Sequence, residues 1–304
     1  MTKKTYWPLL KNILKISITL GALAWVFSKV NIHDLQEAFT KCNPWYLVLA
    51  LLCYVISQLI ASSRLNSFLK VIGIKVSERH NLRLYQLGLL YNFFLPGGIG
   101  GDGYKIYFLR KNHEIKGRKI LSAVFFDRLS GVWALTIITG LLIIFMPRLS
   151  IPNEVTIGAL VIGTITYLYF LYVFFKEFFL HFIVTHLKAL AVQGFQTLSA
   201  ISILQAMHFD GKFAPYLLIF LLSSLVAIIP SILGGLGLRE YLISFGAVYF
   251  KLDPHLAVLV SLVFYVISLI VASSGIYYVL RPQRLGAEKL PSPAEIEHEL
   301  EKNK

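Results

Sequence analysis

The chain has 304 residues and is far more apolar than a water-soluble protein, with 56% hydrophobic residues, 15% charged residues and a mean hydropathy of +0.67. A soluble domain usually carries about 25% charged residues. Several uncharged stretches reach the roughly 20 residues with which an α-helix crosses a bilayer, so the sequence predicts an all-α polytopic membrane protein. The net charge of +13 then reports membrane topology and argues against nucleic acid as a partner. Cys42 and Cys53 form no metal-binding or disulfide pattern, so no structural metal is expected.

Apolar runs between charges predict six crossing helices. They are, in chain order, Leu9 to Ser28, Trp45 to Ser63, Ile120 to Met146, Val155 to Phe175, Ala189 to Met207 and His255 to Leu280, followed by a polar tail at 283–304. The first run lacks a small-residue cleavage site, and we interpret it as a retained anchor.

Charge distribution predicts the orientation of these spans. Six crossings place both termini on one side, and if that side is the cytoplasm, 22 of the 29 Lys and Arg residues lie inside. This count assigns Arg64 to the loop after the second span. The prediction is a multi-pass protein of the inner, cytoplasmic membrane with both termini in the cytoplasm.

One apolar stretch does not fit an ordinary crossing. Leu84 to Gly103 is preceded by Arg79 and Arg83 and followed by Lys105, Arg110 and Lys111, so both flanks belong on the cytoplasmic side. A helix that enters, breaks at Pro96 and the following glycines, and returns satisfies both flanks. We therefore predict a re-entrant hairpin.

The hairpin motif recurs at an offset of 134 residues. The matches are Pro96 with Pro230, Gly100 with Gly234, Gly101 with Gly235, Gly103 with Gly237, and Lys105 with Arg239. A second hairpin, roughly Phe213 to Phe250, would then enter from the opposite side. The prediction is a domain at 1–282 built from inverted half-repeats at about 45–146 and 189–280, an arrangement found in many secondary transporters. The alternative is two unrelated Pro/Gly breaks.

The hairpin tips have the composition of an anion site. Proline ends a helix, glycines leave amide groups accessible, and a helix N-terminus with a nearby cation favours a phosphate. The candidate headgroup-binding residues are Gly100, Gly101, Asp102, Lys105, Arg128, Gly234, Gly235 and Arg239.

Asp127 and Arg128 lie inside the third predicted span, where charges usually pair within the protein. Neighbouring helical residues point about 100° apart, so the two should bind different partners. The expected partners are Asp102 or Glu240 for Arg128, and Lys105 or Arg239 for Asp127. A purely structural ion-pair network is the alternative to a binding site.

Three motifs together carry a family resemblance. They are Asn92 to Asp102 (NFFLPGGIGGD), Phe126 to Gly131 (FDRLSG) and Pro230 to Glu240 (PSILGGLGLRE). In this order they resemble the flippase-like membrane domain of the lysylphosphatidylglycerol synthase transmembrane family, over about residues 8 to 282. In two-domain members, the multiple peptide resistance factors, this part is associated with moving lipid between leaflets, and a soluble domain makes the aminoacylated lipid. The resemblance implies a stand-alone member whose lipid is a phospholipid or an isoprenoid-type lipid.

The leading hypothesis is a transporter that moves a phosphate-bearing lipid between leaflets, with no cofactor and no catalytic residue. One alternative is a membrane-embedded enzyme acting on a lipid phosphate, with Asp102 or Asp127 as base or metal ligand. The other is an accessory subunit that presents lipid to an envelope-lipid biosynthesis enzyme.

Overall fold

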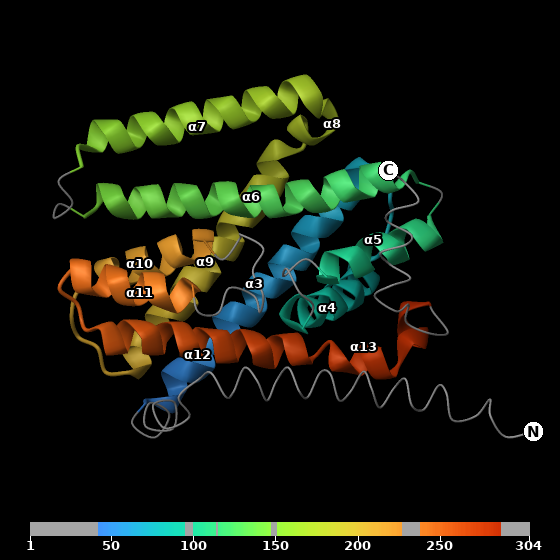
Figure 1. Ribbon diagram of the computed structural model, residues 1–304. Helices are drawn as coiled ribbons and strands as arrows, with labels where there is room; N and C mark the ends of the chain where they lie inside the picture. Colours follow the sequence, from blue (N-terminus) through green and yellow to red (C-terminus); the bar gives the residue numbers. More distant parts are fainter. Residues whose placement is uncertain (1–41, 95–99, 114, 147–150, 227–237, 287–304) are drawn as a thin grey trace, which may run out of the picture. The chain divides into compact units, whose positions relative to one another are not determined.

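A computed structural model describes residues 42–94, 100–113, 115–146, 151–226 and 238–286. Within these ranges the regular elements are all helical, which confirms the all-α prediction. The elements are α3 (Pro44–Val71), α4 (Glu78–Phe94), α5 (Gly100–Asn112), α6 (Gly117–Ile144), α7 (Asn153–Phe174), α8 (Lys176–Phe179), α9 (Phe182–Ala206), α10 (Phe213–Val226), α11 (Leu238–Tyr249), α12 (Pro254–Ser273), α13 (Ile276–Leu280) and the short 3-10 helix η2 (Pro282–Leu285) (Figure 1). These helices belong to one unit that starts at Asn43. The first predicted span, Pro96, Pro230, Gly234, Gly235 and most of the tail lie outside the described residues, as does the side chain of Glu240.

Five segments of the described chain are long and apolar enough to cross a membrane. They are α3, α6, α7, α9 and the stretch Pro254–Leu280 that α12 and α13 share, which matches five of the predicted spans. The chain is therefore a multi-pass membrane protein. The last stretch is interrupted near Gly275, where a Cβ would come within 2.5 Å of the backbone oxygen of Gln86 on α4. This close approach requires glycine.

Two spans start with the same N-capping motif. Asn43 precedes α3 and accepts a hydrogen bond from the Trp45 amide at 3.1 Å, while Asp253 precedes α12 and accepts one from the His255 amide at 2.9 Å. A proline follows each capping residue at the first helical position. An Asn or Asp cap followed by proline satisfies the open amides and presets the helical backbone, so these sequences fix where the helices begin.

The first predicted hairpin is an antiparallel pair of short helices, α4 and α5. A Cβ on Gly101 would overlap the backbone oxygen of Gly88, so the two backbones touch at this point. Next to this crossing, the rings of Tyr91 and Tyr104 stack with centroids 4.0 Å apart. Glycine at the crossing lets the helices approach closely, as small residues do in membrane helix pairs.

The order and packing of the helices repeat along the chain. The run α3, α4, α5, α6 recurs as α9, α10, α11, α12, and Glu78 plus 134 is position 212, one residue before α10 begins. The contacts repeat too: α4 packs on α12 and α10 packs on α6, while α5 contacts α6 and α11 contacts α12. Each hairpin thus packs against the final helix of the other half. The boundaries of the half-repeats and their opposite orientation in the membrane remain predictions.

α7 stands apart from this repeated unit. It connects the two halves and lies alongside α6 (Figure 1). Only 6% of its apolar stretch is buried, against 67% for the stretch Pro254–Leu280. α7 is therefore a peripheral helix whose surface is left mainly for lipid.

The hairpin topology predicts the labelling of its ends. Arg79 and Lys111 are both exposed, and both belong on the cytoplasmic side if α4 and α5 enter and leave by the same face. Single cysteines are placed at these positions in a variant that lacks Cys42 and Cys53. In intact cells neither should react with a membrane-impermeant maleimide, and both should react once the membrane is permeabilised. Reaction of the two positions from opposite sides would make this segment a full crossing.

The glycine crossing predicts a steric effect. Gly101→Ala places a methyl group against the Gly88 backbone, which must move, so we expect a loss of stability of about 1–3 kcal/mol or more. Gly158→Ala on α7 is the matched control because an added Cβ there meets nothing within 4 Å. Thermal unfolding in detergent measures both variants, and equal melting temperatures would show that the hairpin crossing is loose.

Candidate functional site

The described structure contains a buried ion pair between α3 and α6. Nε of Arg64 lies 2.8 Å from Oδ1 of Asp127, and the two side chains are 8% and 9% exposed. The prediction that Arg64 lies in a loop is wrong, because α3 continues to Val71 and carries Arg64 inside the bundle. The prediction of Lys105 or Arg239 as the partner of Asp127 missed this pair.

The neighbouring residue on α6 binds the first hairpin. Arg128 pairs with Oδ2 of Asp102, which confirms one of its predicted partners. The other oxygen of Asp102 accepts from Nζ of Lys105 at 3.1 Å. Asp102 and Lys105 are 10% and 5% exposed, whereas Arg128 is 38% exposed. Arg128 is thus the member of this group that a ligand can reach.

Lys105 is fixed from several sides. Its ammonium lies 4.5 Å from the centroid of the Tyr85 ring, in the geometry of a cation–π contact. The Tyr85 hydroxyl faces Oε1 of Gln58 on α3 at 3.5 Å. The hairpin cation is therefore joined through Tyr85 to the helix that carries Arg64.

The tip of α5 differs from the expected open anion site. Gly101 donates its amide to Oδ1 of Asn92 on α4 at 3.0 Å. Asn92 thus caps the start of α5 from the partner helix of the hairpin. The expectation that the glycine amides are open to a ligand is wrong for Gly101, and Arg128 and Lys105 carry the positive charge of this tip.

Arg239, the repeat counterpart of Lys105, has an aromatic environment. Its guanidinium carbon lies 4.8 Å from the Phe220 ring centroid on α10 and 5.6 Å from that of Phe264 on α12. Guanidinium groups stack favourably on aromatic faces, more so where water is excluded. The cation of each hairpin therefore contacts aromatic rings, Lys105 that of Tyr85 and Arg239 those of Phe220 and Phe264.

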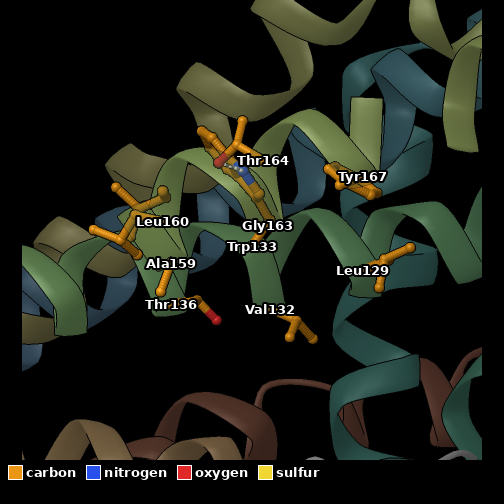
Figure 2. A pocket seen from close by; sticks show the side chains of 10 residues that line it. Leu129, Val132, Trp133, Thr136, Ala159, Leu160, Gly163, Thr164 and Tyr167 are labelled. Atoms are coloured by element: carbon orange, nitrogen blue, oxygen red, sulfur yellow. Dashed lines mark hydrogen bonds between the residues drawn. The ribbon is translucent and has the colours of Figure 1, made fainter. Parts of the chain in front are cut away.

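A crevice that the sequence did not reveal lies between α6 and α7. It has a volume of about 220 Å³, and its walls include Leu129, Trp133 and Thr136 from α6 and Leu160, Gly163 and Tyr167 from α7 (Figure 2). Nε1 of Trp133 donates to Oγ1 of Thr164 at 3.2 Å, and the Tyr167 hydroxyl bonds Nε2 of His186 on α9 at 3.0 Å. The crevice is almost wholly apolar. Apolar helix faces occur throughout this chain, so the sequence did not single out these residues as the lining of a crevice.

A lysine joins α3 and α9 near the predicted cytoplasmic face. Nζ of Lys188 donates to Oγ of Ser63, Oγ of Ser67 and the Ser63 carbonyl at 2.9 to 3.2 Å. The ammonium group thus has three hydrogen-bond acceptors, all of them on α3. The contact stabilises the crossing of the two helices.

Outside the spans, His80 starts the hairpin on its basic flank. Burial lowers the pKa of His80, and its electrostatic interactions with Arg83 and His113 lower it further. The imidazole is therefore neutral near pH 7. Within the described residues, no group of three His, Cys, Asp or Glu side chains is placed to hold a metal ion.

The Arg64–Asp127 pair predicts that one substitution lowers the stability of the protein strongly and that replacing both residues restores most of it. Asp127→Asn leaves Arg64 buried without its counter-charge, which should cost about 3–5 kcal/mol. Replacing both residues, Arg64→Met with Asp127→Leu, should recover most of the loss, because two apolar groups need no partner. Thermal unfolding and yield in detergent measure these variants.

The control is Glu78→Gln, which breaks the Lys70–Glu78 pair whose side chains are both 54% exposed. Exposed pairs contribute about 0–1 kcal/mol, so this variant should stay close to wild type. If Asp127→Asn were as mild as Glu78→Gln, the buried pair would not hold α3 and α6 together.

Comparison with known proteins agrees with this architecture. The family model for the lysylphosphatidylglycerol synthase TM region matches residues 12–274. A UPF0104 membrane protein of Methanocaldococcus jannaschii is 23% identical over 119 residues, which cover 39% of this chain and 35% of the relative. A UPF0104 membrane protein of Pyrococcus horikoshii is 28% identical over 155 residues, 50% of this chain and 44% of the relative. The matches thus span less than half the length of these relatives. The family model, in contrast, covers most of the chain, and the chain therefore belongs to the lysylphosphatidylglycerol synthase TM region family.

Proposed function

We propose that this protein moves a phosphate-bearing lipid between the two leaflets of the cytoplasmic membrane, leaving the lipid chemically unchanged. The observation that carries the proposal is the group Lys105, Asp102 and Arg128 on the hairpin and α6. Its three side chains carry one net positive charge, and Arg128 is the accessible member.

The electrostatics favour a lipid phosphate as the ligand of this group. Charges interact more strongly inside the low-dielectric interior of a membrane protein than in water, so a net positive site attracts an anion. A guanidinium matches two oxygens of a phosphate at once, and the Arg128 side chain is 38% exposed while it pairs with Asp102 through Nε. Lys105 is a second cation at this place, because it and Arg128 both pair with the carboxylate of Asp102.

The helix arrangement supports movement of the lipid as well as binding. Each hairpin packs on the last helix of the other half, so rocking of one half displaces the hairpin that the other half carries. In secondary transporters with inverted repeats, such rocking exposes a central site to each side in turn. The second tip, with Gly234, Gly235 and Arg239, would complete the headgroup site together with Gly100.

The location and partners follow from the same proposal. Both termini would lie in the cytoplasm, because the loops with most Lys and Arg then lie inside. The lipid is a phospholipid or an isoprenoid phosphate, and an envelope-lipid biosynthesis enzyme would supply or use it. The synthase name belongs to the relatives' family, and no aminoacyl transfer is proposed for this chain.

Proteoliposomes test the proposal directly. Purified protein with a fluorescent phosphatidylglycerol or a fluorescent isoprenyl phosphate should make the inner-leaflet probe accessible to an external reductant. Arg128→Gln should slow this step about ten- to a hundredfold, since a charged hydrogen bond contributes about 1.5–3 kcal/mol. The variant should still fold, because Asp102 keeps Lys105 as its partner.

Lys70→Gln is the matched control, because it removes a cation that is 54% exposed at the end of α3. It should transport like wild type if bulk charge is irrelevant. Unchanged transport by folded Arg128→Gln would refute this headgroup site. Chemical conversion of the probe would identify an enzyme, and transport only after addition of a partner would identify an accessory subunit.

A further inference from the structure

We infer that the crevice between α6 and α7 binds one hydrocarbon chain of a membrane phospholipid. The inference rests on the proposed function in one respect, since it gives the chain of the transported lipid a place beside the headgroup site. Its evidence comes from the crevice itself.

The lining selects hydrocarbon over a polar ligand. The lining residues include the aliphatic Leu129 and Leu160 and the aromatic Trp133 and Tyr167. The polar atoms of the two aromatic residues are engaged within the protein, Trp133 with Thr164 and Tyr167 with His186. An apolar chain therefore displaces no strong hydrogen bond when it enters.

The dimensions suit one chain. Both walls follow helical spacing, from Leu129 to Ile137 on α6 and from Ala159 to Tyr167 on α7. Eight residues of helix span about 12 Å, comparable to the roughly 15 Å of hydrocarbon in one leaflet. Beyond Leu160 the crevice closes, because this side chain packs where a Cβ on Gly140 would lie, at 2.6 Å. The volume of about 220 Å³ is of the size that one such chain segment fills.

The position of α7 identifies the bilayer as the source of the chain. α7 is a candidate span that is nearly unburied, and Val161, Ile162 and Ile165 on it are 49%, 67% and 60% exposed. Gly163 is exposed at the crevice, and an added Cβ there meets nothing within 4 Å. A lipid chain can therefore enter sideways from the surrounding membrane.

The crevice also lies next to the proposed headgroup site. Leu129, which lines the crevice, follows Arg128 directly on α6, so both side chains belong to one helical turn. The two side chains point about 100° apart around the helix. A phospholipid with its phosphate at Arg128 would bend around α6 to place one chain beside Trp133.

Tryptophan quenching tests the inference, because Trp133 lines the crevice. The other three of the four tryptophans, Trp7, Trp25 and Trp45, are replaced by Phe. The protein in detergent is titrated with dibrominated phosphatidylglycerol at low lipid-to-detergent ratio, with bromine at mid-chain. We expect saturable quenching of Trp133, and an apparent affinity at least tenfold weaker in Gly163→Leu, whose side chain fills the crevice.

Gly158→Leu is the matched control on the same helix, because it adds the same side chain where a Cβ meets nothing within 4 Å and does not line the crevice. It should titrate like the parent. Ala159→Leu is a second filling variant, used if Gly163→Leu does not elute as a folded monodisperse protein.

Quenching that rises linearly with bromolipid and has the same slope in all variants overturns the inference, because the chain would then be ordinary surface lipid. Binding in detergent involves no leaflets. Saturable quenching without translocation in proteoliposomes would therefore refute the proposed function and leave the chain site standing.

Discussion

The arrangement of the described helices depends on two adjacent residues of α6 that bind in different directions. Asp127 pairs with Arg64 on α3, and Arg128 pairs with Asp102 on α5. A charge removed from water is costly unless it is paired, so each pair restricts where its helix can lie. Because the two side chains point about 100° apart, α6 cannot rotate to satisfy one partner without losing the other. The accessible edge of Arg128 is a consequence of this fixed orientation.

The two halves repeat the fold but not the chemistry. At the offset of 134, Asp127 corresponds to the buried Ser261, and Arg64 corresponds to Leu198, which is 48% exposed. The cations of both hairpins contact aromatic rings, Arg239 those of Phe220 and Phe264 and Lys105 that of Tyr85. The similar packing of the two halves thus carries different residues at the positions of the buried Arg64–Asp127 pair.

Sequence reasoning located five spans, the hairpin helices and Asp102 as one of two expected partners of Arg128, because apolar runs and charges inside them obey strong constraints in a bilayer. It missed Arg64 because a cation at the end of an apolar run resembles a loop residue, and only the continuation of α3 to Val71 places it inside. It missed the role of Asn92 because a cap supplied by a neighbouring helix leaves no local pattern. The crevice at Trp133 depends on how α6 and α7 pack against each other. The apolar periodicity of either helix alone does not predict that packing.

The connection between the halves gives the crevice a mechanical consequence. α7 links α6 of the first half to α9 of the second, and residues of both α6 and α7 line the crevice. If the halves rock, the gap between these helices changes width, and a bound chain has different affinity for the two arrangements. A ligand shifts a conformational equilibrium only through such a difference in affinity. The lipid chain would then favour the arrangement with the open crevice, while the phosphate at Arg128 favours the arrangement with an accessible guanidinium. A lipid that does both couples its own binding to the movement that transports it.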